Sequence, residues 1–361
     1  MTGNSRPTVQ PGSGTQMSHL AQGEVFRFLQ GFIRAQYAAN THVTLSQIAR
    51  LDCEPYRVHP DLVTFFKSER QRILPILRAE LERGYAAGEG IVDLFVSSTR
   101  EYIYQNNQFI TLSPADQWEM AGLYLEFVAD LAQALGGPGH ADEIEGRFQA
   151  AMEGHLAALH AFTLRLDRGN GSGGSSLIHS QVICNEYSPD LQLQVLGIDL
   201  ECLAEPILDV GCGKRGDLVH YLRQAGLEAV GVDRLVEDAS YLVEADWLQM
   251  HFEPSSWGTL VSHMAFSNHF RFHHLYRHGI PEAYAAKFVE MLSSLQPGGA
   301  FYYAPGLPFI ETLLPAGYRI STKSLDVPCW SQVELAREEM QPVVRERFYS
   351  ARIVRMASEI G

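Results

Sequence analysis

The chain has 361 residues, enough for two domains of ordinary size, and its hydrophobic fraction of 46% is that of a globular protein with a real core. Its formal net charge of −14 argues against nucleic acid as a partner, because phosphate backbones need a basic surface. No apolar run approaches the ~20 residues of a membrane span. We therefore expect no membrane contact and a small-molecule or carrier-bound substrate; the oligomeric state stays open.

Cysteine usage and the N-terminus indicate the compartment. The cysteines are odd in number, and no pair has metal-ligand spacing; they stand at positions 53, 184, 202, 212 and 329. Residues 1–16 are rich in Gly, Ser, Thr and Pro and lack the apolar core of a secretory signal, so we expect a disordered tail. These features predict reduced thiols in a cytoplasmic protein without a resident metal.

Residues 17–166 predict an all-helical domain. Apolar residues recur at helical spacing from Val25 to Ile33 and again from Leu74 to Tyr85. Ser113-Pro-Ala-Asp116 is typical of a helix start, and a further helix is expected over 142–166. The expected role of this domain is that of a lid or a substrate-binding domain.

The segment Tyr102–Phe109 mixes aromatic rings with four amides just before that helix start. The rings can be core residues beside an amide-rich loop, or the segment can form a lid that faces a bound ligand. In the second interpretation Phe109 belongs to the site. Residues 167–176, with four glycines and three serines, follow as a flexible linker, and residues 177–361 form the second domain.

The second domain begins with the motif Ile207-Leu-Asp-Val-Gly-Cys-Gly-Lys-Arg-Gly216. It predicts a buried strand and a glycine turn, followed by a helix over 217–225. A second strand, Ala229-Val-Gly-Val232, ends on Asp233. Together these elements predict a βαβ nucleotide-binding unit.

Asp209 restricts the kinds of ligand that this unit is expected to bind. A carboxylate two residues before the first glycine would repel a pyrophosphate, but it favours an ammonium or sulfonium group. Asp233, at the tip of the second strand, is placed to accept hydrogen bonds from both hydroxyls of a ribose. These two acids indicate S-adenosylmethionine. Cys212, inside the turn, is interpreted as a small residue chosen for fit and not as a nucleophile.

The motifs Ile-Leu-Asp-Val-Gly-Cys-Gly and Val-Gly-Val-Asp resemble the first two motifs of the class I S-adenosylmethionine-dependent methyltransferases. Gln296-Pro-Gly-Gly299, a predicted turn before a strand over 300–304, resembles a further signature of that family. The resemblance covers about residues 180–358. It implies an α/β, Rossmann-like domain with a seven-stranded, mostly parallel sheet, whose last strands, at 318–321 and 348–356, form an antiparallel pair.

The resemblance also implies roles for single residues. Tyr187 would place an aromatic face near the sulfonium, where cation–π attraction is worth ~0.5–2 kcal/mol. In the alternative interpretation Tyr187 is a packing residue with a surface hydroxyl. Asp246 would accept a hydrogen bond from the adenine amino group, and Trp247 would pack on the adenine ring. The full set of expected cofactor-binding residues is Asp209, Gly211, Cys212, Gly213, Asp233, Arg234, Asp246, Trp247 and Ser262.

A strand over 259–262 leads into a predicted loop that carries the polar side chains of His263, Asn268 and His269. The family commonly has an acid at the start of this strand, but Gly258 and Thr259 stand there instead. Loops at the carboxyl ends of parallel strands form the site in open α/β sheets, and a histidine can act as a general base near neutral pH. The expected catalytic residues are Tyr187, Asn268, His263, His269 and Phe109.

Three reactions are compatible with these residues. The first is transfer of the methyl group of S-adenosylmethionine to a small-molecule acceptor of the secondary-metabolite type. In the second, the amine of the cofactor's own tail attacks its γ-carbon, which gives azetidine-2-carboxylate and methylthioadenosine; the chain resembles such synthases in its long helical half and its His/Asn loop. The third is a binding module that catalyses no reaction.

Overall fold

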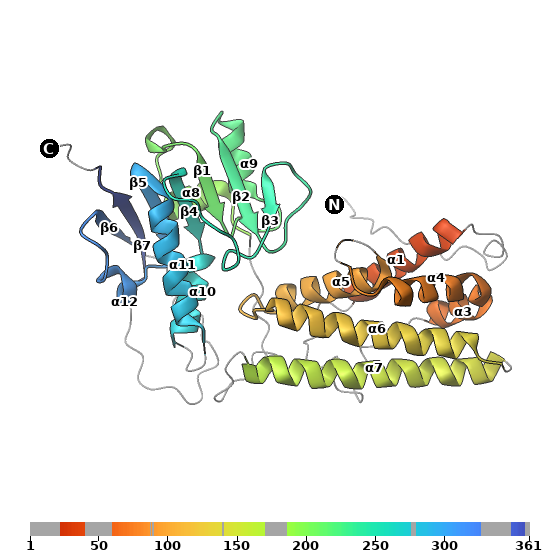
Figure 1. Ribbon diagram of the computed structural model, residues 1–361. Helices are drawn as coiled ribbons and strands as arrows, with labels where there is room; N and C mark the ends of the chain where they lie inside the picture. The colour runs from red at the N-terminus through yellow and green to blue at the C-terminus, as the bar shows by residue number, and fades with distance from the viewer. Residues whose placement is uncertain are drawn as a thin grey trace, which may run out of the picture. The chain divides into compact units, whose positions relative to one another are not determined.

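The computed structural model describes residues 22–39, 60–86, 88, 90–138, 141–169, 186–275, 279–325 and 348–357. These residues divide into two compact units (Figure 1). The described residues up to Asp167 form the helical unit, and those from Glu186 form the sheet unit.

Amphipathic helices build the helical unit. They are α1 (Gln22–Ala39), α3 (Pro60–Ser68), α4 (Arg70–Arg83), α5 (Gly90–Asn106), α6 (Pro114–Gly136) and α7 (Ala141–Gly169). Their apolar stripes meet in one core, in which Phe127 of α6 stacks on His155 of α7 at 4.3 Å between ring centroids. The predicted helical character of this half is confirmed over its described residues.

The predicted helix start at Ser113 is also confirmed. The Ser113 hydroxyl accepts a hydrogen bond from the backbone N–H of Asp116 at 3.2 Å, and Asp116 Oδ2 accepts one from the backbone N–H of Ser113 at 2.8 Å. Pro114 occupies the first helical position, where no intrahelical N–H partner is needed. Two free backbone N–H groups of α6 are satisfied in this way.

A seven-stranded sheet forms the centre of the sheet unit, with the order β3-β2-β1-β4-β5-β7-β6. Its strands are β1 (Ile207–Val210), β2 (Ala229–Asp233), β3 (Leu242–Glu244), β4 (Trp257–His263), β5 (Leu295–Ala304), β6 (Tyr318–Ser324) and β7 (Tyr349–Arg355). Strands β1 to β5 pair in parallel, and β7 pairs antiparallel with both β5 and β6. The expected Rossmann-like, mostly parallel sheet with an antiparallel last pair is confirmed.

Helices cover both faces of the sheet (Figure 1). They are α8 (Pro189–Leu196), the 3-10 turn at Leu200–Cys202, α9 (Asp217–Gln224), α10 (Phe266–Leu275), α11 (Pro281–Ser294) and α12 (Pro308–Glu311). Apolar side chains of α8 and α9 pack into one core, and those of α10 and α11 pack into a second core on the other face. Strand β1 is buried along its whole length between them, which explains why Ile207, Leu208 and Val210 are all apolar.

Three segments differ from the predicted elements. Gln105 and Asn106, two of the amides expected in a loop in the first interpretation, form the end of α5, because α5 stays buried to its end. Residues 296–299 continue β5 instead of forming a turn before it. Residues 167–169 of the expected linker extend α7, and residues 170–176 lie outside the described residues.

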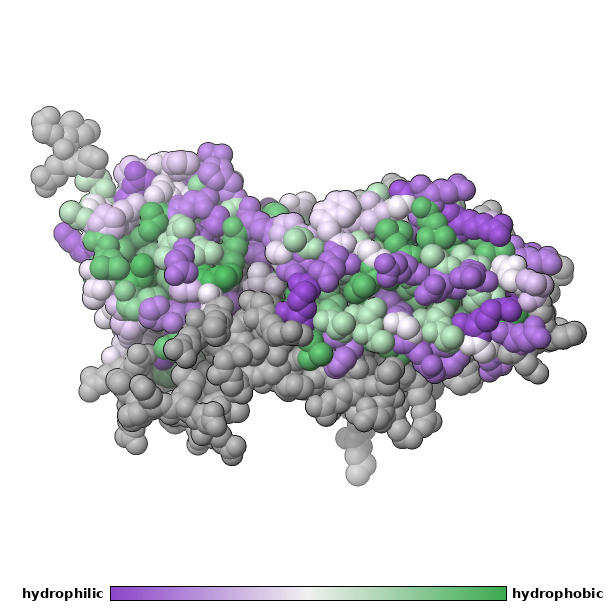
Figure 2. Space-filling view, turned by 60° about the horizontal axis from the view of Figure 1, so that its bottom comes forward, coloured by the Kyte–Doolittle hydropathy of each residue, from purple (hydrophilic) through white to green (hydrophobic). Residues whose placement is uncertain are grey.

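The surface mixes residue types. Figure 2 shows hydrophilic and hydrophobic residues interspersed on the face that it presents of each unit, as expected when amphipathic helices cover a core. Among the described helices, none combines the length and the apolar character needed to cross a membrane.

Candidate active site

Strand order locates the site. Chain connections run outward in opposite directions from the neighbouring strands β1 and β4, so a crevice opens beyond their carboxyl ends. Three chain segments reach this edge of the sheet: the turn after β1, the tip of β2 and the end of β4. Most of the site residues predicted from the sequence stand on them.

The turn after β1 is built tightly. Gly211, Gly213 and Gly216 all have positive φ, at 83°, 78° and 61°. A Cβ at Gly211 would lie 2.1 Å from the Cβ of Ala265, which follows β4. The backbone N–H of Gly211 donates to the Val232 carbonyl at 2.8 Å, so the turn is held against β2.

Asp233 connects the turn to the tip of β2. Its Oδ2 accepts a hydrogen bond from the backbone N–H of Gly213 at 3.1 Å, and its Oδ1 accepts one from the N–H of Leu235 at 3.3 Å. Burial raises the pKa of this carboxyl group, while the positive charge of Arg234 and the backbone N–H donors oppose the rise. A donor that replaced part of the lost hydration would stabilise the ionised form.

The surroundings of Asp209 disfavour a negative charge on its carboxyl group. Its side chain is 2% exposed, and its Oδ2 has no hydrogen-bond partner among the described residues. Burial and the nearby negative charge of Asp233 raise the pKa of Asp209 to about 7. A cation bound beside it would offset both effects, whereas a phosphate would add a further like charge.

Cys212 has an inert thiol. Burial, together with the charges of Asp209 and Asp233, raises its pKa far above the usual value. The Sγ atom donates to the Gly213 carbonyl at 3.4 Å and fills the space above Gly231, where a Cβ would lie 2.7 Å from it. The side chain thus fits the turn and does not provide a thiolate.

Beyond β3, Asp246 and Trp247 form a turn. Asp246 Oδ1 accepts from the backbone N–H of Leu248 at 2.9 Å. The Trp247 ring is 3% exposed, meets the His269 ring edge-on at 5.1 Å, and lies 5.5 Å from the Arg234 guanidinium. Its packing on an adenine ring stays a prediction, because so little of the indole is accessible.

At the end of β4, Ser262 is fully buried and braces the site. Its hydroxyl donates to the Val210 carbonyl at 2.8 Å and accepts from the N–H of Phe266 at 3.0 Å, which joins β1 to the start of α10. The next residue, His263, meets the Tyr187 ring edge-on at 4.9 Å. Met264 then adopts a positive φ of 55°, a strained conformation for a non-glycine residue, as its N–H bonds to the Ala304 carbonyl at 2.7 Å.

The predicted polar loop after β4 is mostly helix, because Asn268 and His269 lie on α10. His269 is buried, with Nδ1 at 3.4 Å from the Tyr284 hydroxyl, and Asn268 is half-buried. Burial lowers the pKa of His263 to about 4 and that of His269 well below the usual value. Both imidazoles are therefore neutral at pH 7 and are weak bases.

Phe109 lies apart from these residues in the chain and belongs to the helical unit. It is 5% exposed, and its backbone N–H donates to Asn107 Oδ1 at 3.0 Å, just after the end of α5. Its expected part in catalysis stays a prediction.

Sequence reasoning missed two residues beside the turn. Glu186 Oε1 accepts from the N–H of Arg215 at 3.1 Å, and the Glu186 side chain passes 3.5 Å from the position of a Cβ on Gly213. Ala265 closes the turn from the other side. Neither contact has a local sequence signal, because each joins segments 29 or more positions apart.

The histidines of this region do not gather into a metal centre. Among the residues that the structure describes, no group of three or more His, Cys, Asp or Glu side chains could hold a metal ion. The histidine at position 278, which follows these histidines in the sequence, lies outside the described residues.

No family model matches the chain, and no curated protein matches it. Among solved structures, an S-adenosylmethionine-dependent methyltransferase from Mesorhizobium loti is similar with a TM-score of 0.29 and 18% identity, over 44% of this chain and 100% of that one. The 1,6-didemethyltoxoflavin-N1-methyltransferase of Burkholderia thailandensis is similar with a TM-score of 0.30 and 15% identity, over 47% of this chain and 76% of that one. These values are too low to assign a function to this chain.

Proposed function

We propose that the sheet unit binds S-adenosylmethionine at the carboxyl ends of β1, β2 and β4. The observation that carries this proposal is the buried Asp209 carboxyl group, whose Oδ2 has no hydrogen-bond partner in the described part of the chain. The ligand that relieves this group is a cation small enough to enter beside a glycine turn. S-adenosylmethionine supplies an ammonium, a sulfonium and a ribose in one molecule.

In this proposal, different residues contact different parts of the ligand. Asp209 faces the cationic part of the ligand, the open backbone of Gly211 and Gly213 allows its close approach, and Asp233 accepts from the ribose hydroxyls. The π-face of Tyr187 stabilises the sulfonium. Arg234, Asp246 and Trp247 border the adenine, while Cys212 and Ser262 keep the turn and β4 in place.

The reaction that we propose is transfer of the methyl group to a small-molecule acceptor. The bound cofactor supplies an electrophilic methyl group, so the protein chiefly aligns the acceptor and excludes water. Neutral His263, His269 and Asn268 provide hydrogen bonds that orient the acceptor. Since both imidazoles are weak bases, the acceptor is one that is already nucleophilic.

The same observation favours a second candidate, cyclisation of S-adenosylmethionine itself. There the nitrogen of the cofactor's tail forms a bond to the γ-carbon while the bond from that carbon to sulfur breaks, which releases methylthioadenosine and azetidine-2-carboxylate. No separate acceptor has to be deprotonated; the amine needs only its neutral form and a dry, ring-lined site. A binding module without catalysis is the third candidate.

One incubation separates these candidates. The purified chain is mixed with S-adenosylmethionine alone, then with a panel of small-molecule acceptors, and the products are analysed by mass spectrometry. We expect S-adenosylhomocysteine only in the presence of an acceptor. Methylthioadenosine together with azetidine-2-carboxylate would identify cyclisation instead, and tight binding with neither product would indicate the non-catalytic module.

Asp233→Ala tests the binding mode. The loss of two charge-assisted hydrogen bonds to the ribose predicts about a 100-fold weaker Kd for S-adenosylmethionine by calorimetry. The two backbone bonds that Asp233 accepts also predict a loss of about 1–2 kcal/mol in the free energy of unfolding. Asp199→Ala is the matched control, since Asp199 accepts from the N–H of Glu201 outside the site. Unchanged affinity in Asp233→Ala would contradict the assignment.

A further inference from the structure

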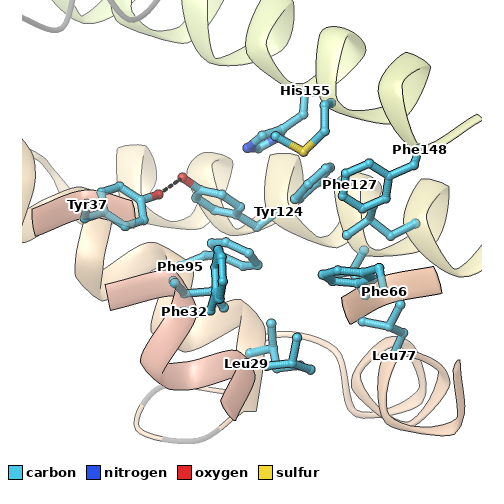
Figure 3. Close-up of a pocket in the computed structure, with 15 residues that line it drawn as sticks. Leu29, Phe32, Tyr37, Phe66, Leu77, Phe95, Tyr124, Phe127, Phe148 and His155 are labelled. Carbon is cyan, nitrogen blue, oxygen red and sulfur yellow. Dashed lines mark hydrogen bonds between the residues drawn. The ribbon is translucent and has the colours of Figure 1, made fainter. Parts of the chain in front are cut away.

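The helical unit encloses a cavity of about 70 Å3 between α1, α3, α4, α5, α6 and α7. Figure 3 shows aromatic rings around this space from several helices, among them Phe66, Phe95, Tyr124, Phe127 and Phe148. The other lining side chains are aliphatic or Met, apart from Phe32, Tyr37 and His155. An occupant with a net charge would lose its hydration here without compensation, so the cavity suits an uncharged group.

The tyrosine hydroxyls at this cavity are engaged with a neighbouring threonine. The Tyr37 hydroxyl lies 2.6 Å from Thr99 Oγ1 and 2.7 Å from the Tyr124 hydroxyl, and Thr99 and Tyr124 are 2.5 Å apart. Three hydroxyls in a triangle can each donate to the next. They make one closed network at the wall.

His155 differs from these tyrosines in its hydrogen bonding. Its side chain is 7% exposed and stacks on Phe127, but its Nδ1 has no hydrogen-bond partner among the described residues. Burial lowers its pKa to about 4, so the imidazole is neutral at pH 7. A buried ring nitrogen without a partner costs on the order of 1–3 kcal/mol, which a polar group of a bound molecule would recover.

We infer that this cavity binds a small uncharged alcohol of about two carbons whose hydroxyl hydrogen-bonds to Nδ1 of His155. The size follows from volume, because a cavity of about 150 Å3 holds a benzene ring, and this one, at about 70 Å3, has half that space. A hydroxyl suits either tautomer of the imidazole, since it can donate or accept. The site is independent of the proposed function of the sheet unit.

The test uses the full chain with 13C-labelled methyl groups and ethanol as the probe. We expect the methyl signals of Ile33, Leu131 and Met152 to shift together and to saturate with a millimolar Kd, while those of Leu208 and Ile353 in the sheet unit stay in place. Ethylammonium, with the same carbon skeleton and a positive charge, should cause no saturable shift. Absence of saturation with ethanol, or equal shifts with both probes, would overturn the inference.

Two variants locate the site. His155→Phe keeps a stacked ring but removes Nδ1, and should weaken ethanol binding roughly tenfold. His160→Phe, on the same helix but outside the cavity lining, should leave the affinity unchanged. Val128→Phe fills the cavity and should abolish binding; an NMR spectrum without probe shows whether it is folded. Equal affinity in the chain with His155 and in His155→Phe would refute the hydrogen bond and with it the proposal.

Discussion

Asp209 joins three conditions that disfavour a negative charge: burial, a neighbouring carboxylate and an oxygen without a partner in the described part of the chain. Its pKa of about 7 means that the carboxyl group is half-protonated at neutral pH. A cationic ligand binds the ionised form, so it must displace this proton. Binding and pH are therefore linked through one residue.

We predict that the affinity for S-adenosylmethionine rises about tenfold between pH 6 and pH 8, because the ionised fraction of Asp209 rises by that factor across a pKa of about 7. Asp209→Asn should bind more weakly at pH 8 and lack this component of the pH dependence. Calorimetry on both proteins, in buffers of different ionisation enthalpy, measures affinity and proton release together. An affinity with the same pH profile in both proteins would remove Asp209 from the site.

His155 gives a second prediction at the residue scale. Burial lowers the pKa of His155, whereas burial raises that of Asp209. Its pKa is about 4 in the folded chain and about 6.5 in an unfolded one, so the unfolded state takes up the proton first as pH falls. Its contribution to stability is complete above about pH 6.5 and is lost between pH 6.5 and pH 4. From pH 7 to pH 4.5, the free energy of unfolding should fall by about 2 kcal/mol more in the natural chain than in His155→Phe. Urea unfolding of both proteins at the two pH values measures these free energies. Comparing the natural chain with His155→Phe cancels the titration of all other groups. Equal losses of unfolding free energy in the two proteins would show that His155 is not buried in its neutral form.

The turn between β1 and α9 is the element on which the site depends. Its shape needs positive φ at three glycines, but only some of these positions are also crowded. A Cβ at Gly211 meets Ala265, whereas one at Gly226, at the end of α9, has no neighbour within 4 Å although φ there is 88°. A side chain at Gly226 would therefore cause backbone strain alone, whereas one at Gly211 would cause backbone strain and a steric clash.

We predict that Gly211→Ala lowers the free energy of unfolding by about 2–4 kcal/mol, as backbone strain adds to overpacking. Gly226→Ala should cost about 1–2 kcal/mol, from strain alone. Only Gly211→Ala should also weaken binding of S-adenosylmethionine, because Ala265 must move away from the turn. Denaturant unfolding measures the loss of stability in the two variants, and calorimetry measures their affinity for S-adenosylmethionine. Equal destabilisation in the two variants would mean that the turn is not closed by Ala265.

At the scale of the whole molecule, the described residues build separate cores. The sheet unit has a core on each face of its sheet, while the helical unit has its own core around α5, α6 and α7. Each proposed ligand contacts residues of one unit alone. A ligand that binds only the folded form of a unit stabilises that unit by mass action.

Differential scanning calorimetry should therefore show two transitions with independent responses. S-adenosylmethionine at 100 times its Kd should add about 2.7 kcal/mol to the stability of the sheet unit and raise one Tm. Ethanol at a saturating, non-denaturing concentration should raise the other Tm, and His155→Phe should remove that second response. A single transition that both ligands move together would show that the two units unfold as one.

Local chemistry in the sequence determined much of the sheet unit. Glycines at 211, 213 and 216 predict a sharp turn because other residues rarely adopt positive φ, and the apolar run of β1 predicts burial on both faces. The acid at the tip of β2 and the Ser113 helix start are likewise short-range features, read within a few residues. The strand order and the antiparallel last pair were expected from a resemblance and not from periodicity.

Only the tertiary structure decided the rest, because the deciding contacts join distant parts of the chain. The raised pKa of Asp209 depends on burial and on Asp233, the bracing role of Ser262 depends on Val210, and the fit of Gly211 depends on Ala265. Local amide-rich composition suggested a loop at the amides of 105–108, but burial of α5 against its neighbours kept Gln105 and Asn106 helical. The cavity around His155 has no signal in the sequence at all, since its lining comes from α1 and from α3 to α7, and a void is a property of packing, not of composition.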